Sequence, residues 1–283
     1  MNNILYKRIL KIATHVLLMT GALLMLVPFA WMISTCFKDI NNVFTYPPNF
    51  IPEKITLDSF SRVFEIMDFG RYYLNNFIIT FLRMFGLFFT ATMAGYGFGR
   101  LEFPGKNFLF ICLLGTMMIP IYVIMFPSFM IIKNFGWIDT YQALTIPQML
   151  GAFGGAFSIF LLKQNFQSIP RELEEAAIID GAGPIRLFWS IMLPQVKPAF
   201  AALAIFSFNG SWNDFIWPLI VTNSDKMKML SLGIARFSSD KEGLTQWPEM
   251  MAASLMALLP VVILFIIAQK KFIENASQSG IKG

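Results

Sequence analysis

The chain has 283 residues, a net charge of +5, and hydrophobic residues at 56% of its positions against 14% charged residues. The core of a soluble domain cannot absorb that much apolar surface, whereas a lipid bilayer can, so this composition excludes an ordinary soluble protein. Lysines near the ends of membrane helices account for the positive charge by meeting anionic headgroups, and no nucleic-acid partner is expected.

Six long apolar stretches follow one another along the chain. Each reaches or exceeds the roughly 20 residues that cross a hydrocarbon core of about 30 Å as a helix. The second stretch contains one charged residue, Arg83, the fifth contains only Asp214, and the others contain none. The sequence therefore predicts an all-α, polytopic membrane helix bundle with six transmembrane helices, and the first is too long for a cleaved signal peptide. In chain order, the expected helices span residues 12–37, 72–99, 107–132, 140–162, 198–224 and 250–269.

Prolines and spaced glycines occur inside these stretches. Each proline removes a helix hydrogen bond and predicts a kink. The pairs Gly95/Gly99 and Gly151/Gly155 have the small-xxx-small spacing that lets helices approach closely, so helices two to five are expected to pack as one unit. The prolines concerned are Pro120, Pro127, Pro147 and Pro218.

The distribution of basic residues predicts the orientation of the chain. With six spans, both termini lie on the same side as residues 100–106 and 163–197. That side carries more Lys and Arg than the other, which predicts that it is cytoplasmic. The residues that decide the orientation are Lys7, Arg8, Lys11, Arg100, Lys106, Lys163, Arg171, Arg186, Lys197, Lys270, Lys271 and Lys282.

A short polar segment, residues 168–194, separates the fourth and fifth spans. Ser168 is expected to cap a helix, with Pro170 in its first turn and glutamates near its positive end. Gly181 ends this helix, and Pro184 can begin a second one over residues 184–192. We therefore predict two short helices joined by an elbow of small residues.

Each short helix has an expected apolar face. Leu173, Ala176 and Ala177 share a face of the first helix by their i, i+3, i+4 spacing. Two interpretations stay open on physical grounds: docking onto a partner protein at the membrane surface, or an amphipathic pair lying on the headgroups. The expected stripe on the second helix consists of Ile185, Phe188, Trp189 and Met192.

Two ionisable residues fall inside the spans, where such residues are functional by default. Arg83 is expected to pair with an acid on another helix, with snorkelling or a place on the transport path as alternatives. Asp214 lies in a polar and aromatic cluster that suits a sugar, because hydroxyls need paired donors and acceptors and pyranose faces stack on aromatic rings. For Asp214 we prefer the alternative, an interhelical hydrogen-bond cluster that stabilises the bundle. The candidate residues of a translocation path are Asn209, Trp212, Asn213, Asp214 and Trp217.

The sequence offers no constellation for catalysis. His15 is the sole histidine, and no cysteine or second histidine lies at metal-ligand spacing from it, so no metal site is expected. Residues 180–184 lack the Gly-Lys-Ser/Thr ending of a phosphate-binding loop. No nucleophile or acid pair appears either, so the chain is not expected to be an enzyme or to hold a cofactor.

Three fixed elements of the polar segment resemble a known motif. Glu175-Ala176-Ala177, Gly181 six residues after Glu175, and Ile191-x-Leu193-Pro194 resemble the EAA signature of the permease subunits of bacterial ATP-binding-cassette (ABC) importers. The wider stretch 168–182 is similar to the carbohydrate-uptake branch, particularly the MalG-like permeases. Residues 210–218, 103–107 and 280–283 are also similar to that branch, so the resemblance covers nearly the whole chain.

The resemblance implies a fold and a function. The fold would be that of a type I ABC importer permease, and the function would be movement of a carbohydrate into a bacterial cell across its cytoplasmic membrane. In this family the EAA loop fits a cleft of a separate ATPase subunit, which binds ATP and Mg and drives rearrangement of the membrane helices. We therefore call residues 168–194 the coupling segment. The residues assigned to ATPase coupling are Glu175, Ala176, Ala177, Asp180, Gly181, Ala182, Ile191, Leu193 and Pro194.

The resemblance also implies partners and a domain plan. In MalG-like members the C-terminal tail reaches between the ATPase subunits, which assigns Gly280, Ile281, Lys282 and Gly283 to that contact. The expected partners are ABC ATPase subunits (two copies or a heterodimer), a second, MalF-like permease, an extracytoplasmic solute-binding protein and membrane lipid. The expected parts are an N-terminal helix and external loop (1–71), a permease core (72–272) and a cytoplasmic tail (273–283).

The main alternative is an ion-coupled secondary transporter. Such a protein needs a complete path in one chain and usually an internal repeat, and the two halves of this sequence show none. The cargo stays open, since a disaccharide, a longer oligosaccharide or a glycerol-phosphate-type solute would all suit the family pattern.

Overall fold

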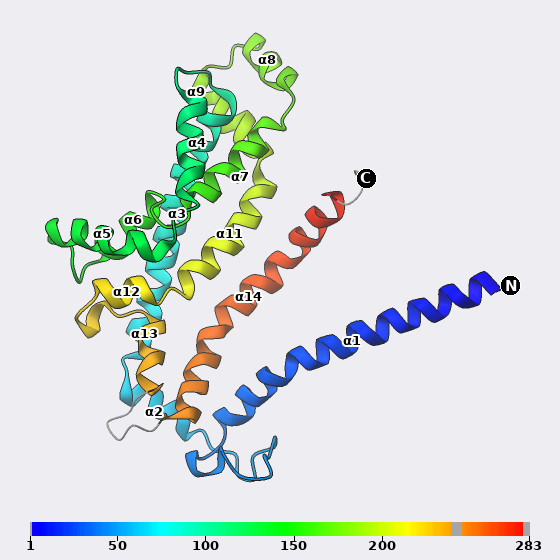
Figure 1. Cartoon of the computed structure of the whole chain (residues 1–283), viewed down its shortest axis with the longest axis vertical. Coiled ribbons are helices and arrows are strands. Elements are labelled where there is room, and N and C mark those ends of the chain that lie inside the picture. Colours follow the sequence, from blue (N-terminus) through cyan, green and yellow to red (C-terminus); the bar gives the residue numbers. More distant parts are fainter. Residues whose placement is uncertain (1, 239–244, 280–283) are drawn as a thin grey trace. The chain divides into compact units, whose positions relative to one another are not determined.

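The computed structural model describes residues 2–238 and 245–279, and within those ranges it contains helices and connecting loops but no strand, which confirms the all-α prediction. Figure 1 labels the principal helices. The helices run in chain order as α1 (Asn2–Cys36), η1 (Ile40–Asn42), α2 (Asp58–Ile66), α3 (Phe69–Arg100), α4 (Lys106–Thr116), α5 (Ile121–Asn134), α6 (Tyr141–Met149), α7 (Gly155–Gln167), α8 (Arg171–Ile179), α9 (Pro184–Arg186), η2 (Leu187–Met192), α10 (Leu193–Gln195), α11 (Lys197–Trp212), α12 (Ile216–Val221), η3 (Asp225–Met227), α13 (Leu230–Ala235), η4 (Arg236–Ser238) and α14 (Trp247–Ser279).

One unit of the chain comprises Met1–Phe69 and Gly233–Leu259. It contains the long apolar helix α1. Polar contacts stabilise the loop that follows α1. The Lys38 ammonium lies 4.2 Å from the centre of the Trp31 ring and donates a hydrogen bond to the Asn49 carbonyl. Arg62 of α2 forms an ion pair of 3.2 Å with Glu249 at the start of α14.

The second unit comprises Gly70–Leu232 and Pro260–Gly283 and holds helices α3 to α12. Helix α3 packs tightly against α7 at two glycines. A methyl group added to Gly95 would lie 2.8 Å from Leu162 Cβ, and one added to Gly99 would lie 3.1 Å from Phe166 Cβ. Small residues at these positions let the two backbones approach, as the small-xxx-small spacing predicts.

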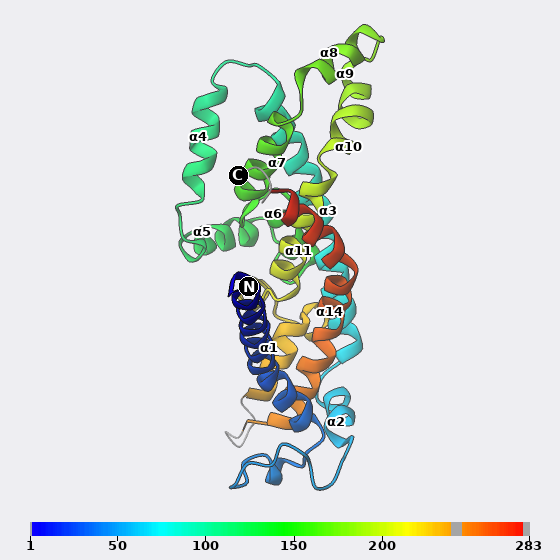
Figure 2. The same ribbon diagram turned by 90° about the vertical axis from the view of Figure 1, so that its right-hand side faces the viewer.

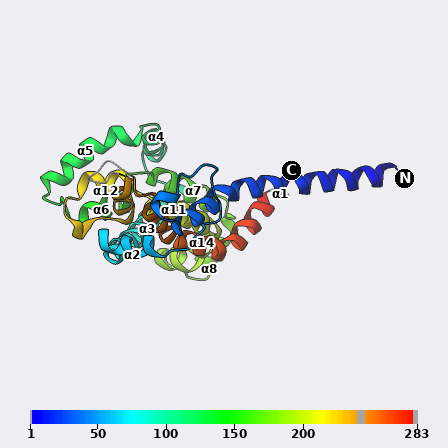
Figure 3. The same cartoon turned by 90° about the horizontal axis from the view of Figure 1, so that it is seen from below.

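Among the described residues, three helices are long and apolar enough to cross a membrane without interruption: Tyr6–Cys36, Phe69–Arg100 and Trp247–Ile267. Two further pairs reach that length together but are bent, by 101° between α4 and α5 and by 71° between Pro184–Gln195 and α11. The first bend is visible in Figures 2 and 3, in which α5 leaves the direction of α4. It falls at Pro120, which cannot donate the hydrogen bond that would continue α4.

The expected fourth span, 140–162, consists of α6 and α7 with a turn between them. Gly151 and Gly154 in this turn have φ of 85° and 95°, a left-handed conformation that favours glycine. Gly151 therefore lies in the turn between the two helices. The expectation that Gly151 and Gly155 share a packing face of one continuous helix is wrong.

The expected fifth span is also interrupted, because α11 ends at Trp212 and α12 begins at Ile216. Asp214 lies in this break, so its expected position in the middle of a helix is wrong. The physical reason is Pro218, which lacks the N–H that would bond to the Asp214 carbonyl in a continuous helix. The Ser231 hydroxyl donates to that carbonyl instead, at 2.6 Å.

Candidate functional site

The coupling segment (residues 168–194) connects α7 to α11 and lies at one end of the second unit, which holds α3 to α12 (Figures 1 and 2). Helix α8 ends at Ile179, and a second helical run begins at Pro184. Between them Gly181 has a φ of 82°, which turns the chain. The predicted pair of short helices with a small-residue elbow is confirmed.

The start of α8 differs from the expectation. Ser168 closes the preceding helix α7, and its hydroxyl donates to the Asn165 carbonyl at 2.8 Å. Pro170 occupies the N-cap position of α8, and no side chain caps it. The predicted cap at Ser168 is therefore wrong, because α7 continues to Gln167 and uses this serine at its own C-terminus.

Arg100, at the end of α3, holds the start of α8 in place. Its guanidinium donates a hydrogen bond of 2.6 Å to the Ile169 carbonyl, and its Nε lies 3.5 Å from a carboxylate oxygen of Glu174. The Arg100 side chain is almost completely buried, which strengthens both contacts relative to water. The sequence marked Arg100 only as a cytoplasmic basic residue, and nothing local to it points to α8.

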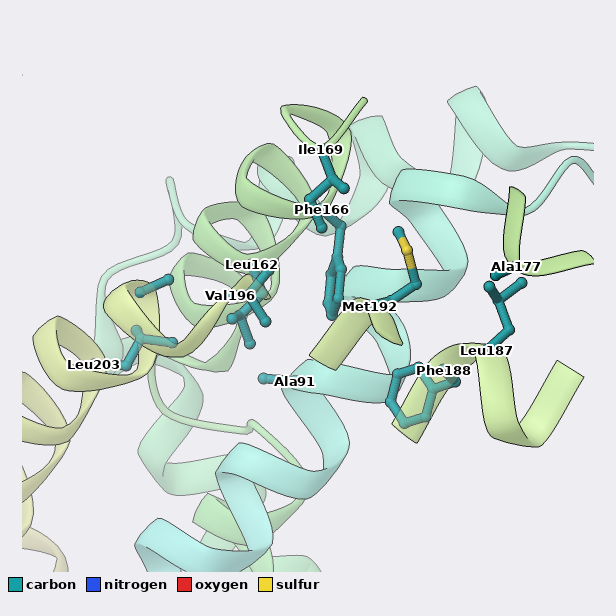
Figure 4. Packing of buried hydrophobic residues seen from close by; sticks show 11 residues of the cluster. Ala91, Leu162, Phe166, Ile169, Ala177, Leu187, Phe188, Met192, Val196 and Leu203 are labelled. Carbon is teal, nitrogen blue, oxygen red and sulfur yellow. The ribbon is translucent and has the colours of Figure 1, made fainter. Parts of the chain in front are cut away.

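The inner face of the coupling segment packs into a hydrophobic cluster shared with α3, α7 and α11 (Figure 4). Ala177 of α8 is buried there, whereas Leu173 and Ala176 are exposed, so the predicted three-residue face is reduced to one buried residue. In the second helical run Phe188 and Met192 are buried.

The other two members of the predicted stripe, Ile185 and Trp189, are exposed. The physical reason is that Leu187–Met192 forms a π-helix, in which hydrogen bonds span five residues and side chains leave the α-helical spacing. Leu187 is buried instead, five positions before Met192.

The outer face of the segment is apolar and acidic. Ile178, Ile179 and Ile185 are 56%, 85% and 78% exposed, and Glu175 and Asp180 are exposed beside them. We call these five residues the docking face. Glu175 has no ion-pair partner among the residues that the structure describes. Exposed large apolar side chains outside the apolar spans are typical of surfaces that bind a partner.

The motif residues divide between the two faces. Glu175, Ala176, Asp180 and Gly181 are exposed. Ala177 is buried, and the remaining four are half-buried, of which three pack against the cluster of Figure 4. Those half-buried residues are Ala182, Ile191, Leu193 and Pro194.

Arg83 and Asp214 meet in the middle of the helical unit. Arg83 Nη1 lies 2.8 Å from Asp214 Oδ2, and Arg83 Nε donates to the Leu144 carbonyl at 2.6 Å. Arg83 does pair with an acid, as expected, but Asp214 lies in the break between α11 and α12 and not on another helix. This ion pair joins α3 to the break between α11 and α12. The buried guanidinium of Arg83 therefore compensates the charge of Asp214 at that break.

The other candidate path residues occupy two different environments. Asn209 and Asn213 are exposed, and the Asn213 amide donates to Asn209 Oδ1 at 2.8 Å. Trp212 is buried among aromatic rings, and Trp217 is buried with its indole N–H donating to the Ala143 carbonyl at 2.9 Å. The terminal residues Gly280, Ile281, Lys282 and Gly283 lie outside the described residues.

Comparison with known proteins identifies the class first. The chain matches the family model of the binding-protein-dependent transport system inner membrane component over residues 91–275. Its fold is similar to that of a chain in the crystal structure of a bacterial ABC transporter involved in the import of the acidic polysaccharide alginate, with a TM-score of 0.77, 24% identity, and coverage of 93% of this chain and 96% of that one. The structure is thus that of an ABC importer permease, a membrane-embedded helical subunit.

Sequence relatives agree with this class. The chain is 33% identical over 279 residues to the sn-glycerol-3-phosphate transport system permease protein UgpE of Yersinia pestis, covering 96% of this chain and 98% of the relative. It is 28% identical over 265 residues to the diacetylchitobiose uptake system permease protein NgcG of Streptomyces coelicolor, covering 94% and 87%. The chain belongs to the family of binding-protein-dependent transport system inner membrane components.

Proposed function

We propose that this chain is a permease subunit that moves a carbohydrate or a related polyol into the cell, driven by ATP hydrolysis on a separate ABC ATPase subunit. The observation that carries this proposal is the docking face, an apolar and acidic surface at the end of a helical membrane unit. The family supports the direction of transport, and the names of two relatives support a cargo rich in hydroxyl groups.

The contacts behind the docking face suggest how force reaches the membrane helices. Ala177 packs in the same cluster as Leu162 of α7 and Leu203 of α11, and Glu174 is paired with Arg100 of α3. Because α8 contacts α3, α7 and α11 in this way, a partner that displaces α8 would also displace these three helices. Glu175 would pair with a basic residue of the ATPase, while the three isoleucines lose water contact in its cleft.

The remaining assembly follows from the same proposal. Both termini and the coupling segment would be cytoplasmic, and a second, MalF-like permease would complete the path. An extracytoplasmic solute-binding protein would deliver the cargo. The two ATPase subunits would bind ATP and Mg, and the four tail residues Gly280–Gly283 would reach between them.

The test uses the whole importer, purified with its ATPase, sister permease and binding protein and reconstituted in liposomes. Glu175→Lys should abolish ATP hydrolysis stimulated by the loaded binding protein, while the subunit still inserts and assembles. The matched control is Glu102→Lys, which reverses a charge that is also exposed and lies in the short loop after α3. Coupled transport by Glu175→Lys at the wild-type rate, or uptake driven by an ion gradient through this chain alone, would refute the proposal.

A further inference from the structure

A cavity of about 320 Å³ lies within the α3–α12 unit and is walled by α3, α5, α6, α7, α11 and α12. Small-molecule sites in proteins range from roughly 300 to 1,000 Å³, so this cavity has room for about one sugar residue. Most of its wall is apolar, and several aromatic side chains contribute to it. The aromatic side chains are Phe153, Phe157, Phe206 and Trp217.

The charged groups that line this cavity balance each other. Arg83 and Asp214 are the two charged residues of its wall, and they are joined at 2.8 Å. A phosphate or carboxylate that entered would meet the Asp214 carboxylate beside the guanidinium and would have to displace it. That exchange leaves a partly buried carboxylate without its partner charge, which is unfavourable. The wall therefore disfavours anionic ligands.

Two buried polar atoms of the wall have no hydrogen-bond partner among the described residues. They are Arg83 Nη2, which is a donor, and Gln148 Oε1, which is an acceptor. Both atoms are covered by protein atoms, so a ligand reaches each of them only after its side chain rotates. A hydroxyl group can then accept from the guanidinium or donate to the amide oxygen, whereas an ionised phosphate or carboxylate cannot donate. Leaving a buried donor or acceptor unpaired is costly, so both atoms favour a hydroxyl-bearing ligand.

We propose that this cavity is a subsite for one uncharged sugar residue of the cargo. Arg83 and Gln148 each bind a hydroxyl of that residue once their planar groups rotate toward the cavity, and the aromatic wall covers the faces of the ring. Asp214 holds the guanidinium and excludes anions. The proposal deepens the proposed function and rests on it, because it assigns this importer to neutral saccharides rather than to phosphate esters or uronates.

The experiment measures thiol labelling in the purified, complete importer without ATP. Ser207 lines the cavity, and Ser207→Cys in a Cys112→Ser background provides a reporter there, since Cys112 is exposed and Cys36 is buried. The probes are neutral glucose, maltose and N,N′-diacetylchitobiose, against anionic sn-glycerol 3-phosphate and glucuronate. With a neutral probe at about ten times its Kd, labelling should slow about tenfold, because the free fraction of the site falls by that factor. The anionic probes should give no protection.

Two variants sharpen the test. Gln148→Leu should abolish protection by neutral probes. Asp214→Asn should create protection by sn-glycerol 3-phosphate, because it leaves the Arg83 charge unbalanced. The control is Asp225→Asn, which removes an exposed carboxylate paired with Lys228 and should leave the labelling pattern unchanged. Size-exclusion chromatography checks that each variant assembles.

Protection by an anionic probe in the reporter protein, no protection by any neutral probe, or unchanged selectivity in an assembled Asp214→Asn variant would each overturn the subsite. Labelling needs no ATP, so protection can persist when Glu175→Lys fails to uncouple the ATPase. The subsite and the coupling mechanism can therefore fail separately.

Discussion

At the scale of single residues, Gly181 shows how one backbone conformation shapes the coupling segment. Its φ of 82° turns the chain between α8 and the helix that begins at Pro184. A methyl group built on Gly181 would meet no atom within 4 Å, so space does not restrict this position. The restriction is the left-handed backbone, which costs an ordinary L-residue about 1–2 kcal/mol and asparagine less.

We therefore expect Gly181→Asn to retain more coupling than Gly181→Ala, and Gly181→Val to retain least. The measurement is ATP hydrolysis by the reconstituted importer in response to loaded binding protein. Gly183→Ala is the matched control, because Gly183 also has open space around it but has a φ of −71° that alanine adopts freely. Equal loss of coupling in Gly183→Ala and Gly181→Ala would show that side-chain size, rather than backbone conformation, matters in the elbow.

Asp139 joins two loops in a way that makes stability depend on pH. Its Oδ1 accepts hydrogen bonds of 2.9 Å from the backbone N–H groups of Asn223 and Ser224. Burial raises the pKa of this carboxyl, but the hydrogen bonds from Ser224 and Asn223 outweigh it and hold the pKa below the ordinary value of 3.8. The folded state thus binds the proton less readily than the unfolded state does.

A lowered folded-state pKa gives stability that is complete above the unfolded value of 3.8 and is lost as the pH falls through the folded value. Asp139→Asn keeps an acceptor and tolerates the φ of 63° at this position, but it should lose this part of the pH dependence. Asp139→Ala should lose about 0.5–1.5 kcal/mol at neutral pH, because the exposed N–H of Asn223 and the half-buried N–H of Ser224 lose their protein acceptor but can still reach water. Thermal unfolding of the purified subunit at several pH values measures both effects, and identical pH profiles for the wild type and Asp139→Asn would contradict the assignment.

At the scale of helices, prolines do more than bend the chain. Pro147 leaves the Ala143 carbonyl without its usual helix donor, and the Trp217 indole donates to it at 2.9 Å. Pro218 leaves the Asp214 carbonyl free in the same way, and Ser231 donates to it. Each of these two prolines therefore leaves a carbonyl that accepts a hydrogen bond from a neighbouring element. Such bonds hold the segments of the broken spans in a defined arrangement.

The contact between α3 and α7 makes a direct prediction. Gly95→Ala would place a methyl group 2.8 Å from Leu162 Cβ, so the helices must separate, and we expect a loss of about 1–3 kcal/mol in stability. Gly97→Ala is the matched control on the same helix, because nothing lies within 4 Å of its added methyl group. That variant should be neutral or more stable by about 0.5–1 kcal/mol, since alanine favours helix over glycine.

Thermal unfolding in detergent compares the two variants. If both glycine variants melt at the same temperature, close packing of α3 on α7 does not contribute to stability.

At the scale of the whole molecule, the proposed orientation in the membrane rests on the positive-inside bias and can be tested by labelling. In the Cys112→Ser background, Lys54→Cys in the exposed loop after α1 should react with a membrane-impermeant thiol reagent in intact cells. Glu175→Cys should react only after the cells are permeabilised. The reverse pattern would invert the proposed orientation and remove the coupling segment from the cytoplasm.

Sequence reasoning predicted the helical class and the two-helix elbow, because both depend on local signals. Apolar runs of membrane length and the Gly181 turn are readable without any knowledge of contacts. The details it missed depend either on competition between local signals or on partners distant in sequence. Ser168 could cap either of two helices, and the π-helical run after Pro184 departs from the α-helical spacing that the sequence pattern assumes.

The sequence by itself therefore determined that the chain is an all-helical membrane protein with a polar segment fit for docking, since hydropathy and motif spacing act locally. Only the tertiary structure decided that Arg100 anchors α8 and that Arg83 neutralises Asp214 at the edge of a cavity. Those pairings join residues 74 and 131 positions apart, and no local preference selects a partner over such separations. Their selection depends on which helices can approach closely, as α3 and α7 do at Gly95 and Gly99.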